Sequence, residues 1–182
     1  MRKKIFKIFG LLSPTIAYMS IALAILKAPS FSWTKNALSD LGVIENSALL
    51  FNSGLMISAV FMFIFGIGLV GVFKGLLGML GITFYLSSSV ALFAIGLFPE
   101  NTGLIHFYVS IAFFCFLSLA LILLGYSSLK HSKTTFGSIT LALGIFTALV
   151  WIFPWSSAAI PELITSTLGA LWTVHTAINV LR

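Results

Sequence analysis

Six long runs of apolar residues, separated by short polar stretches, account for most of the chain. The runs occupy residues 5–26, 47–72, 76–98, 103–129, 134–154 and 160–181. A helix that crosses the hydrocarbon core of a bilayer needs about 20 consecutive apolar residues, and each run has roughly that length. The pattern therefore predicts an all-α, polytopic integral membrane protein, a bundle of six transmembrane helices that forms a single domain over residues 1–182.

Most of the connections between the runs are only a few residues long, at 73–75, 99–102, 130–133 and 155–159. Short connections force neighbouring helices to run antiparallel, so we expect consecutive helices to pack as hairpins.

The connection over residues 27–46 is longer, and its polar pattern has a helical period. We expect a short amphipathic helix over residues 33–41, with Ser32 as its cap and Gly42 as its stop. Its apolar face would consist of Trp33, Ala37, Leu38 and Leu41, and its polar face of Asn36, Ser39 and Asp40. Such a helix either lies in the membrane interface or folds back over the mouth of the bundle, and the sequence leaves both placements open.

Charge is sparse and distributed asymmetrically. Only 8% of the residues are charged, compared with about 25% in soluble domains. The four acidic residues, Asp40, Glu45, Glu100 and Glu162, fall in loops on one side of the predicted membrane. Eight of the ten basic residues fall on the other side, namely Arg2, Lys3, Lys4, Lys7, Lys74, Lys130, Lys133 and Arg182. Because short cytoplasmic loops retain Lys and Arg, both termini are predicted to be cytoplasmic in a multi-pass protein of the cell membrane.

The net charge of +6 does not indicate a nucleic-acid partner. The basic residues flank the apolar runs and form no stripe, so we interpret them as contacts to anionic lipid headgroups. Membrane lipids are the expected partners. The single cysteine, Cys115, excludes an intramolecular disulfide and a cysteine metal cluster.

Two glycine patterns occur in the chain, and they have different interpretations. Residues 66–71 read G-x-G-x-x-G, but a nucleotide site would need a preceding strand, and this motif lies within an apolar run. Gly71, Gly75 and Gly78 are spaced for close packing between membrane helices. We expect tight packing of the second and third helices at this face, which is also a candidate contact for a homo-oligomer.

The candidate functional residues lie on the side of the predicted membrane that carries the acidic residues. His106 begins the fourth apolar run and follows Glu100 by six residues, so the two side chains are predicted to reach the same depth. A histidine beside a carboxylate can form an acid–base pair, and serine, histidine and aspartate are the residue types of a hydrolase. Catalytic zinc usually has three protein ligands, which this set does not supply, so no metal and no cofactor are expected. A purely structural network that ties the loop to the bundle is the competing interpretation. The role of His175, in the sixth run, is left open.

Four short motifs resemble those of a known family. They are Leu38-Ser39-Asp40-Leu41-Gly42, Asn52-x-Gly54, Gly96-x-Phe98-Pro99-Glu100 and His106. In this order they resemble the uncharacterised "domain of unknown function" family 998, six-span membrane proteins of bacteria and archaea. The resemblance implies a prokaryotic six-span protein in which Ser39, Asp40, Asn52, Glu100 and His106 occupy recurring polar positions, but it implies no activity. Such families also resemble lipid-acting membrane hydrolases, although this chain lacks a His-x-x-x-His pair in its last span.

The interpretation favoured by these observations is a membrane protein with an outward-facing polar pocket that binds a lipid or another amphiphile. The candidate catalytic residues are His106, Asp40, Glu100 and Ser39, and the candidate ligand-binding residues are Ser32, Trp33, Asn36, Asn52 and Glu162. Three alternatives remain: a lipid hydrolase that uses His106 with Asp40 or Glu100, a permease for a neutral solute lined by Ser87–Ser89, and a non-catalytic assembly partner. The sequence does not decide whether a reaction is catalysed.

Overall fold

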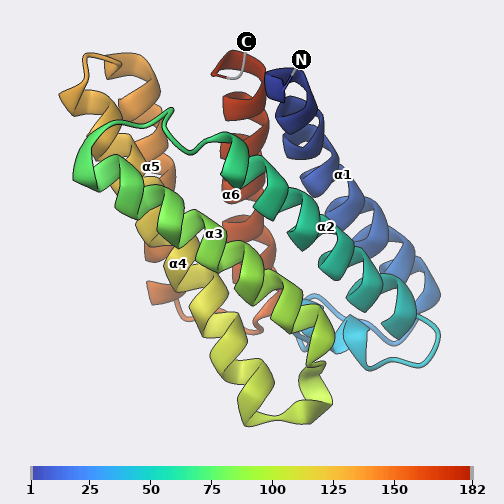
Figure 1. Cartoon of the computed structure of the whole chain (residues 1–182). Helices are drawn as coiled ribbons and strands as arrows, with labels where there is room; N and C mark the ends of the chain where they lie inside the picture. Colours follow the sequence, from blue (N-terminus) through green and yellow to red (C-terminus); the bar gives the residue numbers. More distant parts are fainter. Residues whose placement is uncertain (1, 181–182) are drawn as a thin grey trace.

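A computed structural model of the chain describes residues 2–180, and the secondary structure of this range is entirely helical (Figure 1). The α-helices are α1 (Arg2–Lys27), α2 (Ala48–Gly68), α3 (Gly75–Leu97), α4 (Leu104–Lys130), α5 (Thr134–Leu149) and α6 (Ala159–Asn179). Three short 3₁₀ helices lie between them: η1 (Leu38–Gly42), η2 (Glu100–Thr102) and η3 (Val150–Ile152). Arg182 lies outside the described residues, as do the side chains of Arg2 and Lys3.

The six α-helices fall on the six predicted apolar runs. Five helical segments are long and apolar enough to cross a membrane, namely α1 to α4 and α5 together with η3. The sixth, α6, does not qualify by composition, because its sequence carries Glu162, His175 and several threonines. The membrane class of the protein is therefore supported by five helices, and the crossing by α6 remains a prediction.

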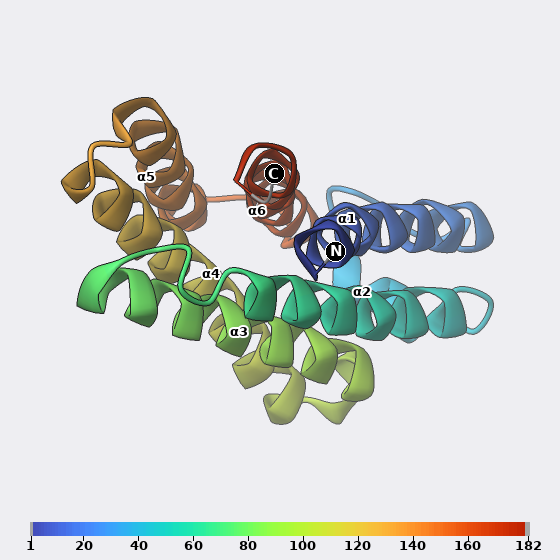
Figure 2. The same ribbon diagram turned by 45° about the horizontal axis from the view of Figure 1, so that its top comes forward.

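Consecutive helices run antiparallel, so both described ends of the chain lie at the same end of the bundle (Figure 1). We call this the terminus end, and we call the opposite end, which carries residues 28–47, the loop end. The helices α1 to α5 pack in chain order, each against the next. Helix α6 returns between the α1–α2 hairpin and the α4–α5 hairpin, where Figure 2 shows it nearly end-on, and it packs chiefly on α1 and α5.

Hydroxyl groups join α6 to three other helices. The Tyr85 hydroxyl of α3 lies 2.9 Å from that of Thr173, and the Tyr18 hydroxyl of α1 lies 2.8 Å from that of Thr167. The Trp172 indole donates to Thr140 of α5 at 3.2 Å. Interhelical hydrogen bonds of this kind hold membrane helices together where burial from water gives no driving force. The polar composition of α6 thus reflects its central position.

Gly71 and Gly75 do not form the predicted packing face. Helix α2 ends at Gly68, and both glycines lie at the turn to α3 with φ of +80° and +73°, in the left-handed region. Gly78 packs against Phe73 of the same turn. Close approach between helices occurs at other glycines instead. An example is the contact of α5 with α4, where a Cβ on Gly144 would lie 2.6 Å from the backbone nitrogen of Ile122. The turn needs positive φ, which the glycine spacing does not reveal.

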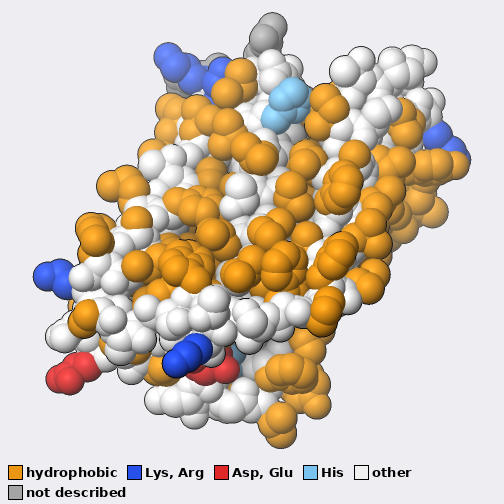
Figure 3. Space-filling model, turned by 180° about the vertical axis from the view of Figure 1, so that it is seen from behind, with side chains coloured by type: hydrophobic (Ala, Val, Ile, Leu, Met, Phe, Trp, Pro, Cys, Tyr) orange, Lys and Arg blue, Asp and Glu red, His pale blue; other side chains and the backbone are white. Residues whose placement is uncertain are grey.

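The charged side chains follow the two ends of the bundle. Asp40, Glu45, Glu100 and Glu162 lie in or beside the segments of the loop end. In the view of Figure 3 the acidic side chains lie at the lower end of the molecule, whereas Lys and Arg occur at both ends. On the face seen in Figure 3, apolar side chains are the main coloured group between the two ends, as expected for a surface that faces lipid.

Candidate functional site

The segment between α1 and α2 is a turn followed by a 3₁₀ helix, and not the amphipathic α-helix that we predicted over residues 33–41. Residues 33–35 form the turn, and η1 starts at Leu38. The Asp40 carboxylate accepts bonds from the backbone N–H of Ala37 at 3.0 Å and from the Asn36 side chain at 2.7 Å. The Asn36 side-chain oxygen in turn accepts from the N–H of Ser32. Side chains that bond nearby backbone groups compete with the helical ladder, which explains the difference.

This segment folds over the loop end of the bundle, which is the second of the two placements left open by the sequence. Leu38, Ser39 and Leu41 are buried. The backbone N–H of Leu38 donates to the Glu162 carboxylate at 2.6 Å, and the N–H of Ala159 donates to the Asn36 carbonyl at 3.1 Å. Both bonds connect η1 and its approach to the first turn of α6.

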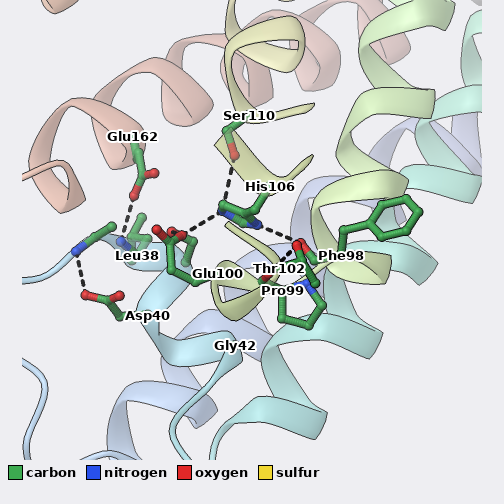
Figure 4. A network of polar contacts seen from close by, with 12 residues as sticks. Leu38, Asp40, Gly42, Phe98, Pro99, Glu100, Thr102, His106, Ser110 and Glu162 are labelled. Atoms are coloured by element: carbon green, nitrogen blue, oxygen red, sulfur yellow. Dashed lines mark hydrogen bonds and ion pairs between the residues drawn. The ribbon is translucent and has the colours of Figure 1, made fainter. Parts of the chain in front are cut away.

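Both ring nitrogens of His106 have polar partners (Figure 4). Its Nδ1 lies 2.7 Å from the carbonyl oxygen of Phe98, and its Nε2 lies 2.8 Å from Oε2 of Glu100. A carbonyl oxygen only accepts, so Nδ1 carries a hydrogen and donates it. The contact between Nε2 and the carboxyl then contains one shared proton, either on an imidazolium or on a neutral Glu100.

Ser39 and Ser110 complete this cluster, which we call the loop-end network: Ser39, Glu100, His106 and Ser110. The Ser39 hydroxyl donates to Oε2 of Glu100 at 2.7 Å. The Ser110 hydroxyl lies one helical turn beyond His106, 3.2 Å from its Nε2. Because Ser39 is on η1, Glu100 on η2 and the other two on α4, the network connects three segments.

Burial differs within the network. The side chain of His106 is 5% exposed, whereas that of Glu100 is 42% exposed. The pair therefore has one buried member and one member at the surface. Glu100 is the group of the network that an external molecule reaches first.

Glu162 lies at the same end, in the first turn of α6, outside the five helices that qualify as membrane spans. Burial raises the pKa of its carboxyl to about 7. The N–H of Leu38 opposes this rise, while the negative charges of Glu100 and Asp40 add to it. Near neutral pH, Glu162 is therefore divided between its neutral and ionised forms.

The remaining candidate residues lie around this centre. Glu100, and not Asp40, is the carboxylate that contacts His106; Asp40 orders its own loop. The side-chain amide of Asn52 donates to the carbonyl of Gly42 and fixes the far end of η1 on α2. Trp33 is partly exposed and packs edge-on against Phe31.

Two apolar cavities continue from the network into the bundle. The loop-end cavity, of about 60 Å³, is bordered at one end by Ser39, Ser110 and Glu162. The central cavity, of about 80 Å³, lies deeper between α1, α2, α4 and α6. The two share five lining residues: Ile21, Leu55, Leu92, Phe113 and Ser166. Their walls are mainly hydrocarbon, so they suit an apolar group.

Sequence reasoning missed Ser110 and Ser166 as site residues. Ser110 follows His106 by four residues and therefore lies on the same helical face. This spacing alone would have identified Ser110 as a neighbour of His106. Ser166 follows Glu162 by the same interval. Ser87–Ser89 do not line either cavity, and the hydroxyls of Ser88 and Ser89 bond carbonyls of their own helix.

His175 takes no part in this site. It lies near the terminus end of α6, where its ring stacks on Phe136 at a centroid distance of 5.5 Å. Within residues 2–180, no group of three or more His, Cys, Asp and Glu side chains is arranged to hold a metal ion.

The chain matches a family model described as "Protein of unknown function (DUF998)" over residues 11–179. No curated protein and no solved structure matches the chain. The matched range contains the loop-end network, both cavities and all of the α-helices except residues 2–10 of α1. Because the match covers nearly the whole sequence, this chain belongs to the DUF998 family of proteins of unknown function.

Proposed function

We propose that this protein binds a lipid or another amphiphile at the outer leaflet of the cell membrane. The polar head would contact the loop-end network and Glu162, and the apolar part would enter the loop-end cavity. The observation that carries the proposal is the position of Ser39, Ser110 and Glu162 at one end of a cavity whose other walls are apolar. Small-molecule sites commonly combine an apolar pocket with a few polar groups that orient the ligand.

The charges at this end favour a cationic or hydroxyl-rich head over a phosphate. Asp40, Glu100 and Glu162 supply three carboxyl groups, and the one ion pair between described side chains at this site joins Glu100 to His106. A negative potential attracts cations and repels anions. An ammonium or a hydroxyl group can also donate to these oxygens, which a phosphate at neutral pH does less well.

The proposal includes an orientation. The loop end faces the exterior and the terminus end faces the cytoplasm, because the positive-inside rule places the Lys-rich connections inside. Residues 163–179 of α6 would form the sixth span, with Glu162 at the level of the loop. An even number of spans agrees with both described ends lying at one end of the bundle.

The test is binding of defined amphiphiles to the delipidated protein in detergent, followed by native mass spectrometry. We expect dodecylamine and dodecyl glycerol ether to bind and dodecyl phosphate to bind more weakly. Ile95→Phe fills the loop-end cavity from a side chain that is 6% exposed, and it should reduce occupancy about tenfold. Val90→Phe is the matched control, because Val90 lies on the same helix and is 59% exposed. Equal binding to both variants, each shown to be folded by circular dichroism, would exclude the cavity as the site.

One observation favours a lipid hydrolase as the second candidate. The Ser110 hydroxyl is 3.2 Å from Nε2 of His106 and also borders the loop-end cavity. A serine beside a histidine of fixed tautomer is the arrangement of an activated nucleophile. Here Nε2 also contacts Glu100, so His106 accepts the serine proton only after that contact opens. Under this alternative, Ser110→Ala and His106→Gln each abolish cleavage of a monoacylglycerol, whereas Ser118→Ala on the same helix does not.

A further inference from the structure

The two cavities lie one after the other along a single stripe of α6. Glu162 and Ser166 border the loop-end cavity, and Ser166, Gly169 and Thr173 border the central cavity. These residues are spaced by three or four positions, so they occupy one face of the helix. The stripe therefore leads from the loop end toward the middle of the bundle.

The lining residues of α4 and α1 place the two cavities in the same order along the bundle. On α4, Ser110 borders the loop-end cavity alone, Phe113 borders both cavities, and Leu117 borders the central cavity alone. On α1, which runs the opposite way, Ile21 borders both cavities, and Ser13 borders the central one. Because helices of both directions agree, the two cavities follow one another along the bundle, and we call them together the path.

The polar groups in the wall of the central cavity already have partners. Ser13 and Ser58 exchange hydroxyl–carbonyl bonds at 3.0 and 2.9 Å. Tyr18 bonds Thr167, and the Thr173 hydroxyl bonds the carbonyl of Gly169. An occupant of this path would have no open polar partner among these groups, and a polar group placed there would lose its bonds to water without replacement. The occupant of the inner part must be hydrocarbon.

The length of the path corresponds to one layer of lipid tails. Glu162 and Thr173 are eleven positions apart, which is about 16 Å at 1.5 Å per helical residue. The hydrocarbon core of a bilayer is about 30 Å thick, so one leaflet contributes about 15 Å. A lipid tail that starts at the loop end therefore reaches Thr173.

We infer that the path takes one hydrocarbon chain of leaflet length, with the lipid head at Glu162 and the chain end beside Thr173. This inference rests on the proposed function and specifies its ligand as an amphiphile that inserts a single unbranched chain into the bundle. The volumes of about 60 and 80 Å³ leave no room for two chains side by side. The paired Ser13 and Ser58 lie in the wall of the inner part of the path.

Photolabelling tests this placement in the unmodified protein. The probe is dodecyl glycerol ether with a diazirine on its terminal carbon, and mass spectrometry of the digested protein reads the labelled positions. We expect the label on wall residues such as Ala17, Leu117 and Ala170. Label found instead on the lipid-facing side chains of the same or neighbouring helices, such as Met19, Ile57 and Leu119, would overturn the inference.

Filling the inner part of the path tests it independently. Ala17→Leu and Ala170→Leu each narrow the central cavity, so we expect about tenfold weaker binding of dodecyl and hexadecyl glycerol ethers and unchanged binding of the octyl ether. Ala22→Leu on α1 and Ala148→Leu on α5 are the matched controls, because both alanines are exposed. A loss that is equal for all chain lengths would contradict the inference. Failure of every ether to bind the unmodified protein would contradict the proposed function itself, so the two failures are distinguishable.

Discussion

At the scale of single residues, the loop-end network is organised around one proton. The Phe98 carbonyl fixes a hydrogen on Nδ1 of His106, so that Nε2 and Glu100 share the proton between them. The Ser39 hydroxyl donates to the same oxygen of Glu100 that contacts His106, so this oxygen connects η1 to α4. Both ring nitrogens of His106 therefore already have partners, and the network offers no free base.

A double-mutant cycle measures this pair. We expect Glu100→Gln and His106→Gln to be coupled by about 1 kcal/mol in the free energy of unfolding, because Glu100 is partly exposed and exposed pairs are weak. Thermal unfolding in detergent gives the four values of the cycle. The pair Glu45→Gln and His106→Gln is the control, with no coupling expected, and zero coupling at Glu100 as well would contradict the shared proton.

Glu162 makes the stability of the protein depend on pH. Its folded-state pKa of about 7 exceeds the ordinary value of 4.5, so the protonated form stabilises the fold. That contribution is complete below pH 4.5 and is lost as the pH rises to about 7.

We expect the free energy of unfolding to fall by on the order of 2 kcal/mol across this interval because of Glu162. Glu162→Gln retains an acceptor for the N–H of Leu38 and does not titrate, so its stability should change less with pH. The measurement is the difference in thermal stability between the two proteins as a function of pH. Parallel curves would show that the pKa of Glu162 is the same in the folded and unfolded protein.

At the scale of elements, close approach and chain reversal use different glycines. The turn between α2 and α3 needs the positive φ of Gly71, around which a Cβ would meet no atom within 4 Å. The contact of α4 with α5 needs the missing side chain of Gly144, where a Cβ would press on the backbone of Ile122. The first requirement is conformational and the second is steric.

These two requirements predict different costs. Gly71→Ala should destabilise the protein by about 1 kcal/mol, the cost of a left-handed conformation for a residue with a side chain. Gly144→Ala should cost about 2–3 kcal/mol, because the backbones of α4 and α5 must move apart. Chemical unfolding in detergent compares both with unmodified protein. If Gly71 also mediates a contact between two copies, Gly71→Ala will change the oligomeric state, which analytical ultracentrifugation detects.

At the scale of the whole molecule, the up-and-down order of the helices separates the charges. Asp40, Glu100 and Glu162 meet at the loop end although they are far apart in the sequence, and Lys74, Lys130 and Lys133 lie in or beside the turns of the other end. The bundle therefore has an acidic end that carries the candidate site and a basic end. This separation supports the proposed orientation in the membrane.

Cysteine labelling tests the orientation. In a Cys115→Ser background, Glu45→Cys should react with a membrane-impermeant maleimide in intact cells, whereas Lys133→Cys should react only after lysis. The contrast arises because the two positions lie at opposite ends of the bundle. Reaction of Lys133→Cys in intact cells would reverse the proposed orientation and place the candidate site in the cytoplasm.

Hydropathy predicts elements well here, because a membrane helix is defined by length and apolar composition alone. The ends of α1, α3 and α4 lie within a few residues of the predicted runs. The end of α2 at Gly68 differs by four residues, since apolar residues continue into the turn. The loop contains a short helix, but it is a 3₁₀ helix that begins at Leu38 and not at Trp33, because an amphipathic period does not register the competing bonds of Asn36 and Asp40.

The sequence by itself determined the membrane class of the protein, the number and order of its helices and the position of His106 and Glu100 at the same end of the bundle, because these depend on apolar length and on spacing along one chain. Only the tertiary structure decided that Glu100 is the partner of His106, that η1 covers the end of the bundle and that two cavities follow the stripe of α6. Those features depend on side chains from several helices, and the distances between them are set by packing, which no local pattern encodes.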